Sequence, residues 1–221
     1  MTKTQVRIVV VSDTHGMHRA LNIPACDILI HCGDATNFGA VEEVAAFAGW
    51  CNDLKSTSLV KHIVFCPGNH DLGLYEASAT DKATHRQTLK KISKVHYLVD
   101  SAVTLCGLRI YGSPWTRRAM SKWAFPFESE QKAYDIFKRI PEDVDILVTH
   151  GPPKGIMDSG FGSIALMDIV QKRQPTYHLF GHVHEGYGQQ TIGSTTFVNG
   201  CSLDERKLAN HAPMLLLVDR K

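Results

Sequence analysis

Side chains that can bind metal ions or move protons are concentrated in a few short motifs of this sequence. The motifs are Asp13-Thr14-His15, Gly33-Asp34, Gly68-Asn69-His70-Asp71, His150-Gly151-Pro152-Pro153 and Gly181-His182-Val183-His184. Together they supply imidazole nitrogens, carboxylate oxygens and an amide oxygen, a mixed set that suits divalent manganese, iron, zinc or nickel. The motifs contain no cysteine, which argues against a structural zinc site. The pattern therefore indicates a metal centre built from nitrogen and oxygen ligands.

Three chemically different side chains follow one another in the third motif. The amide oxygen of Asn69 can bind a hard cation, the imidazole of His70 can move a proton near neutral pH, and the carboxylate of Asp71 can orient an imidazole. By itself, the tetrapeptide that contains them is also what an ordinary tight turn uses. A catalytic interpretation therefore depends on the other motifs.

The candidate ligands outnumber those of a single tetrahedral site. Two metal ions that share one bridging carboxylate would use all of them. Histidines outside the motifs are interpreted differently, because a lone histidine is more often a satisfied surface residue than a metal ligand. This second group consists of His18, His31, His62, His85, His96, His178 and His211.

The motifs follow apolar runs that predict buried strands of a parallel sheet. These runs are 6–11, 27–32, 63–66, 145–149 and 177–180. The spacing of apolar residues predicts helices near 40–54, 128–139 and 164–170, and a polar, partly helical stretch near 77–94. A hairpin is expected at 103–111. Two further strands, at 195–199 and 214–218, are expected to close the chain. Since residues two apart in an extended segment point the same way, Asp13 and His15 share a face. In open α/β sheets, strand carboxyl ends are where chemistry is placed.

Composition fits one α/β domain over residues 1–221. The net charge is +2 without a block of like charges, so we expect neither a long nucleic acid nor an anionic membrane as partner. The six cysteines form no CxxC pair, and we interpret them as buried free thiols of a reducing compartment. No signal peptide or membrane-length apolar stretch is apparent, which favours the cytoplasm. The oligomeric state is left open.

This succession of motifs, each behind a strand, resembles the calcineurin-like metallophosphoesterase superfamily from the first strand to the last. The stretches 111–115, 149–153 and 181–188 further resemble its metallophosphoesterase-domain-containing (MPPED-like) branch. The resemblance implies a four-layer αββα sandwich with the site along one edge. It also implies two divalent ions, the first held by Asp13, His15 and His184, the second by Asn69, His150 and His182, with Asp34 as the bridge.

The same resemblance implies that His70 is a proton donor. Two cations roughly 3.5 to 4 Å apart can deprotonate a bridging water and bind the phosphate oxygens during in-line attack. We favour manganese as the metal. Protonation of the departing alkoxide by His70 would contribute about 10²- to 10⁴-fold. We expect Asp71 to orient Asn69 or His70, or to stabilise the turn.

One position departs from the pattern of many superfamily members. They have a second aspartate in Gly-Asp-x-x-Asp, where this sequence has Asn37. An asparagine can hold the His70 imidazole but cannot stabilise its charge as a carboxylate does. We therefore expect a preference for esters with good leaving groups.

The substrate implied is a small phosphodiester, including cyclic nucleotides. The long loop expected at 112–127 carries Trp115, Trp123 and Phe125, which with Tyr187 could stack a base or could instead pack on the edge of the sandwich. A phosphomonoesterase would use the same metals. A nucleotide-binding regulatory module with little activity is a third alternative, although every ligand position holds a competent residue.

Overall fold

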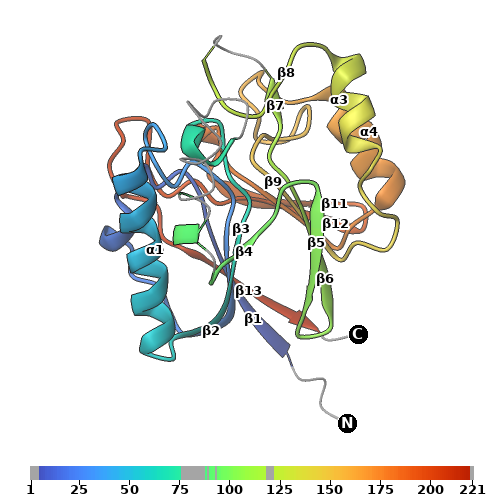
Figure 1. The fold of residues 1–221 in the computed structure, drawn as a ribbon. Helices are drawn as coiled ribbons and strands as arrows, with labels where there is room; N and C mark the ends of the chain where they lie inside the picture. Colours follow the sequence, from blue (N-terminus) through green and yellow to red (C-terminus); the bar gives the residue numbers. More distant parts are fainter. Residues whose placement is uncertain (1–4, 76–87, 89, 93, 118–121, 220–221) are drawn as a thin grey trace.

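The computed structural model describes residues 5–75, 88, 90–92, 94–117 and 122–219. Two β-sheets face each other, and helices cover their outer faces (Figure 1). Helix α1 (Val41–Ser56) lies on one sheet, while α3 (Glu130–Phe137) and α4 (Ile164–Arg173) lie on the other. This is the expected four-layer αββα sandwich. Among the described residues no helix is both long and apolar enough to cross a membrane.

The first sheet has the order β13-β1-β2-β3-β4. Its strands are β1 (Gln5–Val11), β2 (Cys26–His31), β3 (Val60–Phe65), β4 (His96–Tyr97) and β13 (Met214–Asp219). Strands β1 to β4 are parallel, and β13 runs antiparallel beside β1. The expected strands of this sheet are therefore present, and the carboxyl ends of the four parallel strands lie at one edge.

The second sheet has the order β11-β12-β10-β9-β6-β5. Its strands are β5 (Ser101–Leu105), β6 (Leu108–Ser113), β9 (Ile146–Thr149), β10 (Tyr177–Phe180), β11 (Gly188–Ile192) and β12 (Thr195–Asn199). Strands β6, β9, β10 and β12 are parallel, and β5 and β11 form antiparallel edges. The expected hairpin is the pair β5–β6.

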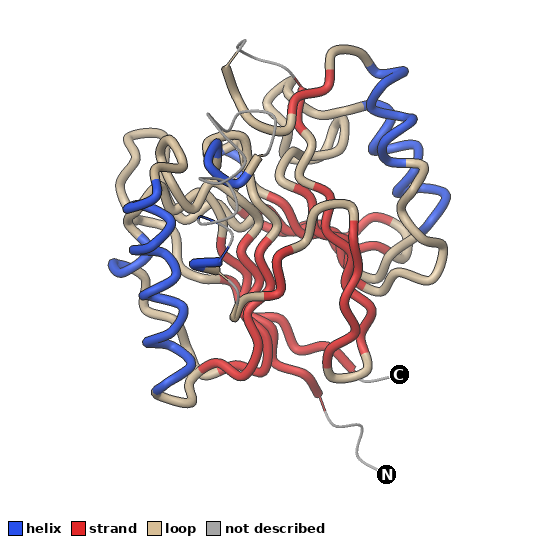
Figure 2. The backbone as a smooth tube through the Cα atoms, viewed as in Figure 1, coloured by secondary structure: helices blue, strands red, loops and turns tan. Residues whose placement is uncertain are grey.

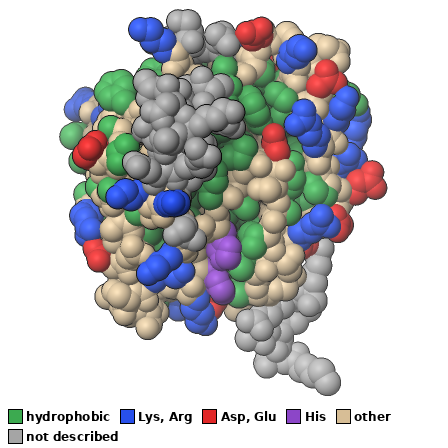
Figure 3. All heavy atoms as spheres, in the orientation of Figure 1, with side chains coloured by type: hydrophobic (Ala, Val, Ile, Leu, Met, Phe, Trp, Pro, Cys, Tyr) green, Lys and Arg blue, Asp and Glu red, His purple; other side chains and the backbone are tan. Residues whose placement is uncertain are grey.

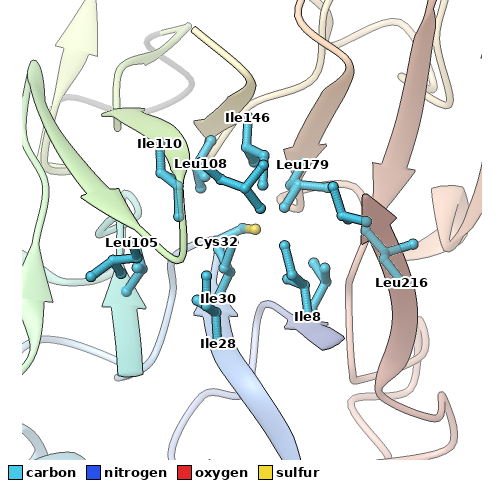
Figure 4. Close-up of a cluster of buried hydrophobic side chains, with 14 of the residues drawn as sticks. Ile8, Ile28, Ile30, Cys32, Leu105, Leu108, Ile110, Ile146, Leu179 and Leu216 are labelled. Atoms are coloured by element: carbon cyan, nitrogen blue, oxygen red, sulfur yellow. The ribbon is translucent and has the colours of Figure 1, made fainter. Parts of the chain in front are cut away.

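The central core lies between the two sheets. Ile8, Ile28 and Ile30 of the first sheet meet Ile146 and Leu179 of the second (Figure 4). The alternate residues of the same strands face the helices, in separate apolar clusters under α1 and under α3 with α4. Burial on both faces explains why these strands are continuous apolar runs and not alternating ones.

Several elements differ from the sequence expectations. Strand β11 is an unpredicted edge strand because its residues are mostly exposed and polar, and so lack an apolar alternation. The loop expected at 112–127 contains two short strands, β7 (Thr116–Arg117) and β8 (Pro126–Phe127), which pair in parallel. A strand of two residues is too short to show the alternation of apolar and polar residues from which strands are predicted. Most of the stretch expected near 77–94 lies outside the described residues.

All six cysteines are free thiols, as expected. Five of them are buried, and Cys106 is only half-buried. Because no cysteine is tied into a bridge, the core and the hydrogen-bonded sheets hold the described fold together.

Three histidines expected at the surface, His18, His31 and His178, are buried instead, and His31 and His178 are fully buried. His31 contacts Thr14 Oγ1 through Nε2 at 3.0 Å, and His178 contacts Thr149 Oγ1 through Nε2 at 2.9 Å. Burial lowers the pKa of each imidazole to about 3. Both rings are therefore neutral members of the core.

Replacement of His178 by phenylalanine is expected to weaken the dependence of stability on pH. The folded pKa of about 3 lies below the unfolded value, so this histidine's contribution is complete above about pH 6.5 and is lost as the pH falls towards 3. Between pH 7.5 and pH 5 the wild type should lose roughly 2 kcal/mol more than His178→Phe. Urea unfolding at both pH values measures this, with half-buried His62→Phe as control. Equal losses in the wild type and His178→Phe would contradict it.

Candidate metal centre

The five polar motifs meet at the carboxyl ends of β1, β2, β3, β9 and β10, where loops gather at one end of the sandwich (Figure 2). Backbone hydrogen bonds join the loops: Asp13 N donates to Gly33 O at 2.9 Å and Gly181 N donates to His150 O at 3.0 Å. A bridge between Ser12 and the segment after β12 links the two sheets here. The structure thus brings all the expected ligands together.

One group of ligand atoms comes from Asp13, His15 and His184, which lie within 4.8 Å of one another. Asp13 Oδ1 is 3.7 Å from His184 Nε2. His184 is oriented by its other ring nitrogen, Nδ1, which lies 2.9 Å from the carbonyl oxygen of Leu203. A proton on Nδ1 leaves the Nε2 lone pair free for a cation.

A second group comes from Asp34, His150 and His182, again within 4.8 Å. His150 Nε2 lies 3.3 Å from Asp34 Oδ2 and 3.0 Å from Asn69 Oδ1, which places Asn69 at this group. His150 Nδ1 lies 2.9 Å from the carbonyl oxygen of Cys32. The Cys32 carbonyl therefore orients the ring in the way that carbonyls orient metal-binding histidines.

Asp34 lies between the two groups. Its Oδ2 atom is 3.3 Å from His150 Nε2 on one side and 3.9 Å from His15 Nε2 on the other. The Asp34 side chain is only 3% exposed. This carboxylate is therefore in the position that a bridging ligand requires.

Two divalent cations fit the residues present. Asp13 Oδ1 is buried and, within the described part of the chain, accepts no hydrogen bond. Its partner oxygen, Oδ2, is held by His182 N at 2.9 Å and by Cys201 Sγ at 3.1 Å. A buried carboxylate oxygen facing an imidazole without a hydrogen bond is costly unless a cation completes it.

The charges of the centre are coupled. Burial opposes ionisation of Asp34, but the charge and hydrogen bond of His150 lower the pKa of this carboxyl far below its usual range. Burial lowers the pKa of His150, but the charge of Asp34 outweighs burial and raises this pKa to about 9. Burial lowers the pKa of His182 to about 4, so this ring is neutral, as a metal ligand must be. A cation at His150 Nε2 would displace a proton there.

The backbone of the centre is strained. Asp13, His15, Asp34 and His182 all have positive φ, at 53°, 43°, 54° and 68°. Such conformations are uncommon outside glycine and cluster at functional sites. They turn each side chain sharply from its strand towards the centre, a feature that the strand-end motifs by themselves do not indicate.

His70 lies beside the two groups with its Nε2 4.0 Å from Asp34 Oδ2. Its Nδ1 lies 2.7 Å from the main-chain carbonyl of Asn37, and Trp123 packs on the ring at 3.9 Å between centroids. His70 also forms a possible ligand group with His15 and Asp34. Its role as proton donor stays a prediction.

The expected role of the Asn37 side chain is corrected. Asn37 contacts His70 through its main-chain carbonyl, while its side-chain Nδ2 donates to the carbonyl oxygen of His15 at 3.1 Å. Any residue at position 37 would supply this main-chain carbonyl. The replacement of the usual aspartate therefore does not remove the group that accepts the proton of His70 Nδ1.

The expected contact of Asp71 with Asn69 or His70 is also corrected. The Asp71 carboxylate accepts hydrogen bonds from Thr36 N at 3.0 Å, Thr36 Oγ1 at 2.8 Å and Gly68 N at 2.8 Å. Burial and the nearby Asp34 raise the pKa of Asp71 to about 7. Asp71 thus ties the loop of Asp34 to the loop of Asn69, which matches the turn-stabilising alternative.

The expected aromatic walls separate into different roles. Trp115 Nε1 donates to Asp100 Oδ2 at 2.9 Å, and Phe125 is buried against Trp115, so both rings pack on the edge of the sandwich. Contact of Trp115 with a substrate stays a prediction. Tyr187 stacks on His211 at 4.2 Å and borders a surface hollow beside His184. The Tyr187 hydroxyl donates to the carbonyl oxygen of Ala212 at 2.9 Å, and contact of Tyr187 with a substrate stays a prediction.

One residue at the centre was missed from the sequence. Cys201 Sγ lies 3.1 Å from Asp13 Oδ2 and is fully buried. Nothing in the local sequence marks this cysteine, since its contact with Asp13 depends on the bridge between Cys201 and Ser12, which lie after β12 and β1.

Comparisons with known proteins show the family and the fold. The sequence model of the calcineurin-like phosphoesterase family matches residues 6–186. Metallophosphoesterase domain-containing protein 1 of Homo sapiens is 36% identical over 216 residues, covering 87% of this chain and 65% of that protein. A UPF0046 protein of Caenorhabditis elegans is 34% identical over 236 residues, covering 96% of this chain and 81% of that protein.

A solved structure, TT1561 of Thermus thermophilus, shares the fold with a TM-score of 0.64 and 17% identity, covering 99% of this chain and 100% of that chain. The present chain spans only 65% of the length of the human relative. The resemblance to the MPPED-like branch is confirmed by the similarity to that relative. With its family model matched over most of its length, the chain belongs to the calcineurin-like phosphoesterase family.

Proposed function

We propose that this chain is a phosphodiesterase that uses two divalent metal ions to hydrolyse small phosphodiesters such as cyclic nucleotides. The observation that carries the proposal is the position of Asp34 between two groups of ligand atoms. His70 lies beside it, with its Nε2 atom 4.0 Å from Asp34 Oδ2. Bound cations would supply an activated water and neutralise charge on the phosphate oxygens. Manganese remains the favoured metal and the cytoplasm the favoured location.

The residues around the centre support a division of roles. Asp13, His15, Asp34, Asn69, His150, His182 and His184 would hold the metal ions. The carbonyl of Asn37 holds His70 Nδ1, so His70 exchanges protons through Nε2, which points to the centre. Trp123 covers the His70 ring and limits its access to water. His70 can then donate a proton to the oxygen of the leaving group.

A diester is favoured over a monoester by charge. Glu185 and Glu205 line the hollow next to His184, with Lys207 as the cation among them. Two carboxylates beside the centre repel a dianionic monoester more than a monoanionic diester. On the face drawn in Figure 3, basic and acidic side chains are interspersed, which agrees with a small substrate and not a long nucleic acid.

An aryl phosphodiester is expected to be hydrolysed with a higher kcat/KM than the aryl phosphomonoester of the same leaving group, with manganese present. A chelator should abolish both rates, and added manganese should restore them. Parallel assays of the two esters, with metal content measured on the same sample, test this. A higher rate on the monoester would indicate a phosphatase, and no turnover despite bound metal would indicate a nucleotide-binding module.

A further inference from the structure

A pocket of about 290 Å³ opens beside the candidate metal centre. The segment 182–184, which carries the candidate ligands His182 and His184, lines it together with Phe161, Glu185, Glu205 and Lys207. We propose that this pocket binds the nucleobase of the substituent that stays on phosphorus, and that Phe161 and Lys207 determine specificity. The proposal rests on the phosphodiesterase function and names the part of the substrate that the site selects.

Phe161 is an exposed aromatic ring on a loop that is held firmly. The ring is 55% exposed, yet it lies 6.3 Å from the His182 ring, in an edge-to-face arrangement. The Asp158 carboxylate organises the loop by accepting hydrogen bonds from Gly155 N at 3.0 Å and Gly162 N at 3.2 Å. A large apolar ring kept in water by an ordered loop next to the metal ligands is suited to stack on a planar ligand.

Lys207 is presented by a second ordered loop. The Asp204 carboxylate accepts hydrogen bonds from Arg206 N at 2.8 Å and Leu208 N at 3.0 Å. Lys207 has a φ of 58°, and its N–H donates to Asp204 O at 2.8 Å. The backbone that carries this ammonium group is therefore placed in advance and does not need to be ordered on binding.

The polar lining matches the edge of a nucleobase. Glu185 and Glu205 can accept hydrogen bonds from ring and exocyclic N–H groups, while Lys207 can donate one to a ring nitrogen or carbonyl. Bases carry both donors and acceptors on one edge, whereas an alkyl substituent carries neither. An aromatic face together with both kinds of polar group therefore favours a nucleoside over a simple alkyl ester.

The position of the pocket indicates which substituent it takes. His70, the expected donor to the leaving group, lies with Asn37 and Trp123, and none of these three is among the described residues that line the pocket. The leaving oxygen, which receives the proton, therefore lies outside the pocket. The base in the pocket belongs to the nucleoside that remains bound to phosphorus after hydrolysis, and in a cyclic nucleotide that nucleoside also carries the leaving oxygen.

Two measurements on the manganese-loaded protein test the proposal. The first compares the Kd of a nucleoside 5′-monophosphate with that of methyl phosphate. The second compares kcat/KM for a nucleoside 5′-(p-nitrophenyl) phosphate with that for methyl p-nitrophenyl phosphate, since these diesters share a leaving group. Phe161→Leu should weaken nucleotide binding and kcat/KM for the nucleoside ester about 10-fold and leave the methyl compounds within about 2-fold. Phe161→Tyr should restore the wild-type values.

Ile164→Ala is the matched control, because Ile164 has the same 55% exposure and follows the same loop. It should change none of these values. Lys207→Met should weaken the nucleoside compounds selectively, as Phe161→Leu does. Equal effects of Phe161→Leu on nucleoside and methyl compounds, or no effect on either, would overturn the proposal. If the wild type hydrolyses neither diester but the Phe161→Leu variant binds the nucleotide more weakly than the wild type does, the result supports nucleotide binding in the pocket and contradicts the phosphodiesterase function.

Discussion

Substitution of His70 by alanine is expected to lower kcat for alkyl phosphodiesters by about 10²- to 10⁴-fold while both metal ions stay bound. Asn69→Ala, one residue earlier, is expected to lose the second metal ion. The difference follows from their contacts. Asn69 Oδ1 lies 3.0 Å from His150 Nε2 within the second ligand group, whereas His70 is held by the Asn37 carbonyl and by Trp123.

Metal content by mass spectrometry and steady-state rates, measured on the same preparations, separate the two roles. If His70 protonates the leaving group, the loss in His70→Ala should be large for alkyl diesters and small for p-nitrophenyl diesters, whose leaving group needs no proton. Asn69→Ala should be impaired on both and should recover at high manganese. Equal metal loss in the two variants would mean that His70 is a ligand, as its proximity to His15 and Asp34 would allow.

Gly181→Ala is expected to reduce activity by about 10²-fold or more and to destabilise the fold. A Cβ atom at Gly181 would overlap Ser12 Oγ and Asp13 Oδ2, so the Asp13 carboxylate must move. A displacement near 1 Å at a reacting centre costs about 10²-fold in rate, and an overpacked core costs about 1–3 kcal/mol. Rates, metal content and urea unfolding of the variant measure both effects.

Gly49→Ala is the matched control for this substitution. The nearest atom to a Cβ at Gly49 is Arg19 Nη2, at an ordinary contact distance of 3.7 Å. On helix α1 the change should leave activity unaltered and stabilise the fold by about 0.5–1 kcal/mol. A Gly181→Ala protein with wild-type metal content and rate would show that Asp13 tolerates the displacement and is not a required ligand.

The contrast between Asn37 and Asp71 shows where local sequence is insufficient. From the sequence, the Asn37 side chain was expected to hold His70, and Asp71 was expected to orient Asn69 or His70 or to stabilise the turn. In the structure, Asn37 acts through its main-chain carbonyl, and Asp71 binds the backbone of Thr36 and Gly68. Which atom of a loop residue faces a neighbour depends on the path of the whole loop, and no motif encodes that path.

The expectation that residues 1–221 form one domain stays a prediction.

The sequence by itself determined the candidate metal ligands and the parallel strands that present them. Strands buried on both faces need continuous apolar runs, and ligands such as Asp34 and His150 directly follow those runs, so covalent neighbours are enough to reveal both. Only the tertiary structure decided that Asp34 lies between the two ligand groups, that Cys201 supports Asp13, and that Phe161 stands beside His182. These contacts join residues far apart in the chain. They arise from the packing of one sheet on the other, which the spacing of neighbouring residues does not specify.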